Sequence, residues 1–422
     1  MKQTLIISCP ASSRSGYGDH SRDIIRSLIE MDRFDIKILD QRWGDCPRNA
    51  LAKDDIINTM LLPNPNQLPY KPDVWIQITV PNEFQAIGNY NIGITAGMET
   101  DQISGPWIDG CNRMNKIIVP SVHSKDVILN TILEERRGEQ VLRKLQVEKP
   151  VEVLFEGLNI DVFDKKDVKF DGLKEVKETF CFLCVGHWLN GTFGNDRKDI
   201  GGVIRTFLET FKGSALNKPA LILKTSSAGF SVMDREEMLK RIEQIKDSVN
   251  SANLPNVYLL HGDLTEEEMN QLYNDPKVKA MVSFTHGEGF GRPLLEFGIT
   301  GKPVVAPNWS GHIDFLSENG ILLPTQLREV DKSAVWKDVI VEGSKWAYID
   351  YGYASATLKE LFKKYKDFLT KSRKQRKYIK DNFTMRHMTE LFKSMIEESV
   401  PKKVELKLPK LKLPKLEKVT NE

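Results

Sequence analysis

The sequence predicts an α/β protein made of two successive halves, each built around a parallel β-sheet covered on both faces. Short runs rich in β-branched residues alternate with amphipathic segments, which is the pattern of parallel strands joined by helices. The alternation restarts after a charged segment at 161–178, DVFDKKDVKFDGLKEVKE, which has the composition of a linker. The length of 422 residues is also typical of two or three domains.

The first half contains six expected strands and two expected helices. The strands are TLIIS (4–8), FDIKILD (34–40), DVWIQITV (73–80), YNIGITAG (90–97), NKIIVPS (115–121) and VEVLFEG (151–157). The helices, which are amphipathic, are DHSRDIIRSLIEM (19–31) and SKDVILNTILEERRGEQVLRKL (124–145).

The second half repeats this pattern with five expected strands. They are TFCFLCVG (179–186), KPALILKTS (218–226), NVYLLHG (256–262), KAMVSF (279–284) and KPVVAP (302–307). Helices intervene, for example DREEMLKRIEQIKDSVNSA at 234–252. After residue 355 the chain becomes helical and basic, which is typical of a solvated helix face.

The last residues form a separate basic tail. The sequence LKLPK occurs at 406–410 and again at 411–415, and a proline every five residues prevents a stable helix. Residues 402–418 hold seven Lys and two Glu. This composition predicts a disordered tail that aids solubility; docking onto an acidic partner or a membrane surface is the alternative.

Composition bounds the location and the partners of the protein. A net charge of +2 does not by itself indicate a nucleic-acid or membrane surface, and no apolar run approaches the 18 residues of a membrane-spanning helix. The first residues are interpreted as a strand rather than as a signal peptide. Five scattered cysteines fit a reducing compartment, so a cytoplasmic location is expected. Within CFLC, Cys181 and Cys184 should face opposite sides of a strand as buried thiols.

A glycine-rich loop is the main candidate site. The expected strand at 279–284 is followed by HGEGFGRPLLEFGITGKPVVAP (286–307), which holds a loop with three glycines, a helix that starts near a proline, and another strand. Free N–H groups at the helix start favour an anion such as phosphate. Glu288 and Glu296 cannot bind phosphate, but carboxylates accept hydrogen bonds from hydroxyl groups. A nucleotide-sugar carries hydroxyls on both sides of its phosphates; the alternative is an ordinary helix start with acidic residues.

The motif E-x7-E in EGFGRPLLE, followed by GKPVVA, resembles that of the retaining GT-B glycosyltransferases of family four. Similar segments extend along most of the chain: SGYGDHSRDI (15–24), KIIVPSVHSKDVI (116–128), LFEGLNIDVF (154–163) and VYLLHGDLTEEEMNQLY (257–273). The resemblance implies the GT-B fold, in which two Rossmann-like domains have parallel sheets that face each other across a cleft. It implies an acceptor-side domain at 1–165, a nucleotide-sugar domain at 166–375, a helix at 376–400 packed back on the first domain, and the tail at 401–422.

The same resemblance implies roles for individual residues. Glu288 would contact hydroxyls of the donor sugar, and Glu296 would hold the ribose. The amides of Phe290 and Gly291, next to Gly289, would receive the diphosphate. Further expected substrate contacts are His286 at the donor sugar and Gly16 and Gly18 in the amino-terminal glycine loop.

The sequence departs from the family pattern at two places. His187 stands where an Arg is expected, so Lys198, which matches the family Lys, would carry the diphosphate with help from Arg197 and Arg292. Glu99, in TAGMETD, follows the strand after which many members place a His. It would either reach the acceptor hydroxyl as a catalytic group or cap the segment that follows.

The resemblance implies transfer of a sugar, with retention, from a UDP- or GDP-linked donor to an acceptor hydroxyl, without a cofactor. No D-x-D motif and no zinc-type spacing occur, so metal independence is expected. The acceptor stays open between a glycan, a lipid, a protein and a hydroxylated DNA base. The alternatives are a nucleotide-sugar epimerase of the same fold and a non-catalytic carbohydrate-binding protein.

Overall fold

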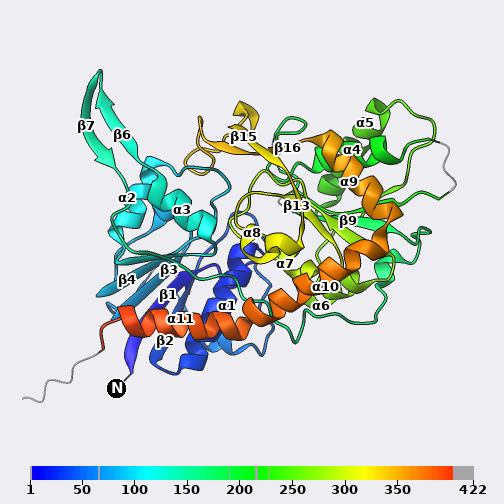
Figure 1. Cartoon of the computed structure of the whole chain (residues 1–422). Coiled ribbons are helices and arrows are strands. Elements are labelled where there is room, and N and C mark those ends of the chain that lie inside the picture. The colour runs from blue at the N-terminus through cyan, green and yellow to red at the C-terminus, as the bar shows by residue number, and fades with distance from the viewer. Residues whose placement is uncertain (1, 65–66, 190, 214–216, 228, 403–422) are drawn as a thin grey trace, which may run out of the picture.

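The computed structural model describes residues 2–64, 67–189, 191–213, 217–227 and 229–402, and it contains two domains with one parallel sheet each (Figure 1). The first sheet has the order β2-β1-β3-β4-β5-β8. Its strands are β1 (Gln3–Cys9), β2 (Phe34–Asp40), β3 (Val74–Ile78), β4 (Tyr90–Ile94), β5 (Lys116–Val119) and β8 (Val151–Val153). All neighbouring pairs in this sheet are parallel.

Helices cover both faces of the first sheet. The helices are α1 (Gly16–Met31), α2 (Gly105–Arg113) and α3 (Val122–Asn130). Helix α1 begins where the Ser15 hydroxyl accepts a hydrogen bond from the Gly18 amide, and its apolar side, with Ile24 and Leu28, packs on one face. Helix α2, with Trp107 and Cys111, and helix α3, with Val127 and Ile128, pack on the other face.

The second sheet has the order β11-β10-β9-β12-β13-β14, again entirely parallel. Its strands are β9 (Cys181–Val185), β10 (Ala220–Lys224), β11 (Val257–Leu259), β12 (Val278–Val282), β13 (Val304–Pro307) and β14 (Ile321–Leu323). Its helices are α4 (Ile200–Phe211), α5 (Val232–Ser248), α6 (Glu266–Asn274), α7 (Arg292–Gly298) and α8 (Ile313–Leu316). The predicted pair of parallel α/β halves is therefore confirmed.

The two cysteines of CFLC lie on opposite faces of the second sheet, as predicted. Cys181 belongs to the apolar cluster with Phe297 on α7, and Cys184 to the cluster with Phe207 on α4. Both thiols are free and buried. A redox or zinc role for this pair is therefore unsupported.

The predicted helix 124–145 is wrong in its second half. Helix α3 ends at Asn130, and the chain continues as an antiparallel hairpin of β6 (Leu133–Arg137) and β7 (Gln140–Leu145) that projects from the domain (Figure 1). Gly138 makes the turn with a φ of 63°, which other residues seldom adopt. Leu133 and Leu145 pack at the base of the hairpin, whereas Val141 and Leu142 are exposed, so the apolar spacing does not mark one buried helix face.

A second antiparallel pair and three helices follow the second sheet in the described part of the chain. The pair is β15 (Thr325–Glu329) with β16 (Lys345–Ile349), and the helices are α9 (Tyr351–Lys363), α10 (Tyr365–Asn382) and α11 (Met385–Ser399). Helix α10 packs on the second domain, against α7 and α8, while α11 lies beside α1 of the first (Figure 1). The change of domain falls at Phe383 and Thr384, where Leu158 of the other connection forms backbone hydrogen bonds to Phe383 and Met385.

The basic tail from residue 403 onward lies outside the described residues. Immediately before it, the Val400 carbonyl accepts a hydrogen bond from Arg33 and the Pro401 carbonyl accepts one from Gln3. The chain is therefore anchored to the first domain up to this point. Within the described ranges, no helix is long and apolar enough to span a lipid bilayer.

Candidate functional site

The glycine loop lies at the carboxyl end of β12, between the two domains. Residues 283–291 follow this strand and lead into α7, and the segment 95–99, which follows β4 of the first domain, contacts them. Ligands of parallel α/β sheets bind outside the carboxyl ends of the strands, because successive loops and helix starts meet there. The fold therefore places the predicted loop at a position suited to ligand binding.

Two of the loop glycines allow the domains, rather than a ligand, to approach. A Cβ atom on Gly289 would lie 1.7 Å from the carbonyl oxygen of Ala96, and one on Gly287 would lie 2.1 Å from that of Glu99. The Ser121 hydroxyl, at the start of α3, donates a 2.6 Å hydrogen bond to the Gly289 carbonyl. Backbone of the first domain therefore fills the space beside these two glycines, and the expected substrate contact of Gly289 stays a prediction.

Four charged side chains from both domains converge beside the loop. Lys198 donates a hydrogen bond to Glu288, and Arg197 lies 3.6 Å from the same carboxylate and 3.3 Å from Glu99. All four are largely buried. Burial alone would raise the pKa of Glu288, but Lys198 and Arg197 outweigh it and hold that pKa below its ordinary value. Arg197 thus connects the two domains, a role that the sequence did not indicate.

Glu99 has a different electrostatic environment. Burial raises its pKa above the ordinary value, even though Arg197 acts in the opposite direction. Arg197, rather than the segment that follows, is its charged partner. A carboxyl group with a raised pKa that lies next to the loop is suited to exchange a proton with a bound hydroxyl group.

The backbone N–H groups of Phe290 and Gly291 have no hydrogen-bond acceptor among the described residues. The amide of Glu288, in contrast, donates to the Ser310 hydroxyl. The Phe290 ring points away into the core and packs against Phe315 at 5.1 Å. Only the backbone of Phe290 is therefore available, which agrees with its expected use as an amide donor.

Arg292 does not carry a free charge for an anion. Its guanidinium lies 2.7 Å from Asp23 on α1 and donates to Glu296 at 3.2 Å. The Glu296 carboxylate also accepts a 3.1 Å hydrogen bond from the buried Tyr273 hydroxyl. Arg292 is therefore paired with carboxylates in this structure, and its expected contact with the diphosphate stays a prediction.

Excess carboxylates surround Arg292 at the domain interface. Glu156 lies 3.9 Å from it, and Asp19 and Asp23 of α1 lie nearby. Burial, with a contribution from these neighbours, raises the pKa of Glu156 to about 8 and that of Glu296 to about 7. Both carboxyl groups therefore bind protons more tightly in the folded than in the unfolded protein.

This difference predicts a loss of stability with increasing pH. Since the folded pKa values lie above the ordinary 4.5, stabilisation by protonated Glu156 and Glu296 is complete below pH 4.5 and is lost as the pH rises through 7 to 8. Glu156→Gln should raise the free energy of unfolding at pH 8.5 by about 2–4 kcal/mol and change it little at pH 5. Urea denaturation at both pH values measures this, with Glu139→Gln on the exposed hairpin as control. An equal effect of Glu156→Gln at both pH values would contradict it.

The two histidines of the expected site make backbone contacts. His286 is buried, stacks on Trp346 at 4.6 Å and has both ring nitrogens close to carbonyls, of Ala347 at 2.6 Å and Gly194 at 3.1 Å. These contacts connect the loop to β16, so His286 positions the loop. His187, at the end of β9, lies 2.8 Å from the Ser227 carbonyl through Nδ1.

The amino-terminal glycines also differ from each other. A Cβ on Gly16, the first residue of α1, would meet no atom within 4 Å, so this position faces open space. A Cβ on Gly18 would lie 2.1 Å from the Ser13 carbonyl oxygen. Gly18 is therefore required by packing within the loop, and only Gly16 leaves room for a ligand.

Sequence reasoning missed the residues that support the loop from behind. Ser310 has a φ of 80°, and its hydroxyl accepts a hydrogen bond from the Glu288 amide. Gly311 packs against Gly289, and a Cβ atom on Gly311 would lie 2.1 Å from the Gly289 carbonyl oxygen. The only available signal was the run NWSGH directly after the strand at 304–307. Within the described residues, no group of three or more His, Cys, Asp or Glu side chains is arranged to hold a metal ion.

No protein-family model matches the sequence, and no curated protein matches it either. Solved structures are similar in fold. Sucrose-phosphate synthase from Thermosynechococcus elongatus has a TM-score of 0.64 at 13% identity, over 94% of this chain and 99% of that one. HepE of Anabaena, solved with UDP and glucose, has a TM-score of 0.58 at 11% identity, over 94% of this chain and 100% of that one. A glycosyltransferase from Rickettsia africae has a TM-score of 0.57 at 12% identity, over 94% of this chain and 98% of that one. The two parallel Rossmann-like domains and these similarities together establish that the chain has the GT-B fold.

Proposed function

We propose that the protein is a glycosyltransferase that moves a sugar from a nucleoside-diphosphate donor to an acceptor hydroxyl group. The observation that carries the proposal is the glycine loop, where the amides of Phe290 and Gly291, which have no acceptor among the described residues, lie in the same loop as Glu288, which holds Lys198. The amides and the ammonium group suit a diphosphate, and the carboxylates of Glu288 and Glu296 suit the hydroxyls on either side of it. HepE has this fold and was solved with UDP-glucose, which supports such a donor here.

The chemistry follows from the position of the charges. Negative charge develops on the leaving diphosphate, where Lys198 and the loop amides would stabilise it without reorganisation. Arg197 is shared between Glu288 and Glu99, so it would also orient the carboxylates on both sides of the reaction centre. Contact of the loop with Ala96 and Glu99 would help to exclude water from the reaction centre. The motif supports retention of configuration, as in family four.

Nucleotide-sugar binding and turnover test the proposal directly. Isothermal titration with UDP, GDP and their sugar conjugates should identify one donor base, and a ligand at 100 times its Kd should raise the free energy of unfolding by about 2.7 kcal/mol. The slow hydrolysis product of the bound donor should keep its anomeric configuration by NMR. Binding without turnover would contradict the proposal in favour of a carbohydrate-binding protein, and isomerised nucleotide-sugar would do so in favour of an epimerase.

The two glutamates should act on different parts of the donor. Glu296→Gln is expected to weaken binding of the free nucleoside diphosphate, because it loses a hydrogen bond to the ribose worth about 1.5–3 kcal/mol. Glu288→Gln should leave this affinity nearly unchanged and lower the rate of transfer. Titration of each variant with the diphosphate, together with its turnover, measures the difference. Equal losses of diphosphate affinity in both variants would contradict the assignment of Glu296 to the ribose and of Glu288 to the donor sugar.

Transfer should not require a divalent metal. The groups proposed to face the diphosphate, Lys198 and the amides of Phe290 and Gly291, are part of the chain and cannot be removed by chelation. Turnover in excess EDTA is therefore expected to stay within about twofold of the untreated rate. Complete loss of turnover that Mn²⁺ restores would show that the leaving group is stabilised in another way.

A further inference from the structure

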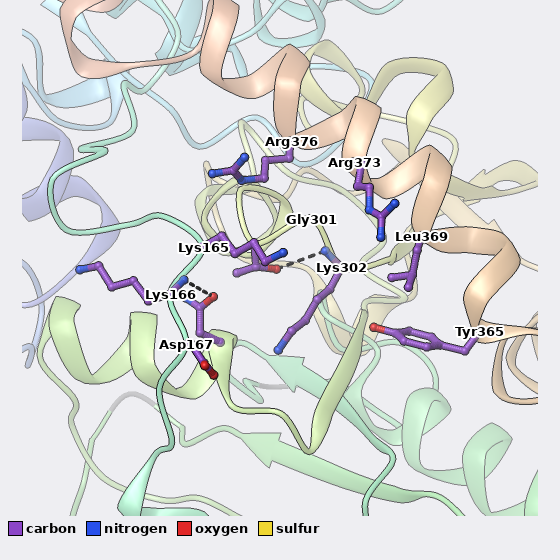
Figure 2. Close-up of a pocket in the computed structure, with 11 residues that line it drawn as sticks. Lys165, Lys166, Asp167, Gly301, Lys302, Tyr365, Leu369, Arg373 and Arg376 are labelled. Atoms are coloured by element: carbon purple, nitrogen blue, oxygen red, sulfur yellow. Dashed lines mark hydrogen bonds between the residues drawn. The ribbon is translucent and has the colours of Figure 1, made fainter.

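A cavity with a volume of about 830 Å³ lies at the opposite end of α7 from the glycine loop. Its walls come from the connection between the domains, from the segment between α7 and β13, and from α10 (Figure 2). Gly291 precedes α7, whereas Gly301 and Lys302 of the cavity follow it. None of its lining residues belongs to the candidate active site.

The cavity carries a large excess of positive charge. Five basic residues line it, with one acidic residue, Asp167; the basic ones are Lys165, Lys166, Lys302, Arg373 and Arg376. The Lys166 side chain points away from the cavity, and its ammonium group donates a hydrogen bond to the Val162 carbonyl (Figure 2). In the part of the chain that the structure describes, only Arg376 among these five has a salt bridge, to Asp164 at 2.7 Å. Its Nε atom is nevertheless buried without a hydrogen-bond partner. The positive charges are therefore largely uncompensated by the protein itself.

The lowered pKa of Lys302 shows that burial among like charges disfavours its charged form. Its ammonium group donates hydrogen bonds to the carbonyls of Tyr273 at 2.7 Å and Asp275 at 2.9 Å, and it has no salt bridge among the described residues. Burial, followed by the nearby charges of Lys279 and Lys165, lowers its pKa to about 7. A group of like charges at one cavity is unfavourable unless an anion neutralises it.

We propose that this cavity binds a ligand that carries two or more phosphate groups. Arginine forms paired hydrogen bonds to phosphate oxygens, and lysine adds point charges around them, so Arg373, Lys165 and Lys302 provide suitable contacts from three segments. In Figure 2 the Tyr365 side chain extends from α10 toward Lys302, and Leu369 is drawn between Tyr365 and Arg373 on the same helix. These two side chains form an apolar wall for the carbon skeleton of the ligand. A free metabolite and a lipid headgroup present the same chemistry.

The cavity lies where the connection between the domains meets α10. Lys165 and Lys166 follow Asp164, which holds Arg376 and Lys380 of α10, each at 2.7 Å. The domains are joined at this point by two segments only, within the described residues: the connection at 154–180 and the α10–α11 crossing. A phosphate ligand that contacts both Lys165 and Arg373 would add to the Asp164 contacts that hold the connection against α10.

Titration of the full chain with inorganic pyrophosphate tests the proposal. The double variant Lys165→Glu/Arg373→Glu should weaken the binding at least about tenfold, because two charged contacts become repulsive. Lys366→Glu/Lys374→Glu changes the same net charge on exposed residues of α10 outside the cavity, and it should stay within about threefold of the wild type. Melting temperatures of both double variants verify that they are folded. Pyrophosphate could also bind at the glycine loop. The variant Lys198→Ala should lose that binding, whereas binding at the cavity should persist in this variant.

Flotation with phosphatidylcholine vesicles that contain a phosphoinositide distinguishes the two ligand sources. Binding that is lost in the cavity variant and kept in the control identifies a lipid headgroup, and pyrophosphate binding without flotation identifies a soluble ligand. The proposal is overturned if millimolar pyrophosphate does not bind the wild type outside the glycine loop. Equal affinity of both double variants would also overturn it. Since the proposal does not depend on sugar transfer, either result leaves the proposed function intact.

Discussion

Lys198→Ala is expected to abolish nucleoside-diphosphate binding and to lower turnover about 100- to 1,000-fold, the loss typical of one preorganised charge-stabilising group. Lys198 is the cation in closest contact with Glu288, and the loop amides are the remaining donors proposed to face the diphosphate. Its removal also leaves Glu288 buried with only the more distant Arg197, at 3.6 Å, so the variant should be less stable by about 3–5 kcal/mol. Titration with the diphosphate, turnover and urea denaturation measure these three quantities.

Lys116→Ala is the matched control for this experiment. Lys116 is also a buried lysine paired with a glutamate, Glu152 at 2.7 Å, but it lies on β5 of the first domain. Its loss should cost stability without changing diphosphate affinity. If Lys198→Ala binds the diphosphate as tightly as Lys116→Ala does, Lys198 has only a structural role, and the charge on the leaving group must be stabilised elsewhere.

Gly289→Ala should separate the glycine loop from the first domain and reduce transfer about 100-fold, as expected when catalytic groups are displaced by about 1 Å. A Cβ atom at this position would lie 1.7 Å from the Ala96 carbonyl oxygen. The Cβ atom and this oxygen are both fixed to the backbone, so a change of side-chain rotamer cannot relieve the clash. The contact with Ser121 would be broken in the same movement. Turnover measures the functional loss, and small-angle X-ray scattering should show an increased radius of gyration.

Gly105→Ala provides the comparison for this substitution. Gly105 is the first residue of α2, and a Cβ there would lie 3.9 Å from a Leu133 methyl group, an ordinary contact. This variant should keep full turnover and the scattering profile of the wild type. Normal turnover in Gly289→Ala would mean that the contact with Ala96 is not part of the active arrangement in solution.

The hairpin at 133–145 shows where local sequence patterns are insufficient. Glu, Gln, Arg and Leu all favour helices, and the apolar residues have a spacing compatible with one. The pairing that defines the hairpin, for example Glu135 opposite Arg143 with a 2.6 Å salt bridge, is equally compatible with the same residues. Gly138 was the informative residue, since a glycine between charged residues favours a turn.

The sequence by itself determined the two parallel sheets and the identity of the glycine loop, because both depend on short-range features. Strand–helix alternation specifies a buried parallel sheet, and a loop with three glycines before a proline-started helix is recognisable within eight residues. Tertiary structure alone decided what the charged residues contact. Arg292 and Asp23 are 269 positions apart, and Lys198 and Glu288 are 90 apart. Whether a charge is free for a ligand depends on which distant carboxylate folding brings within about 4 Å of it, and no local pattern records that distance.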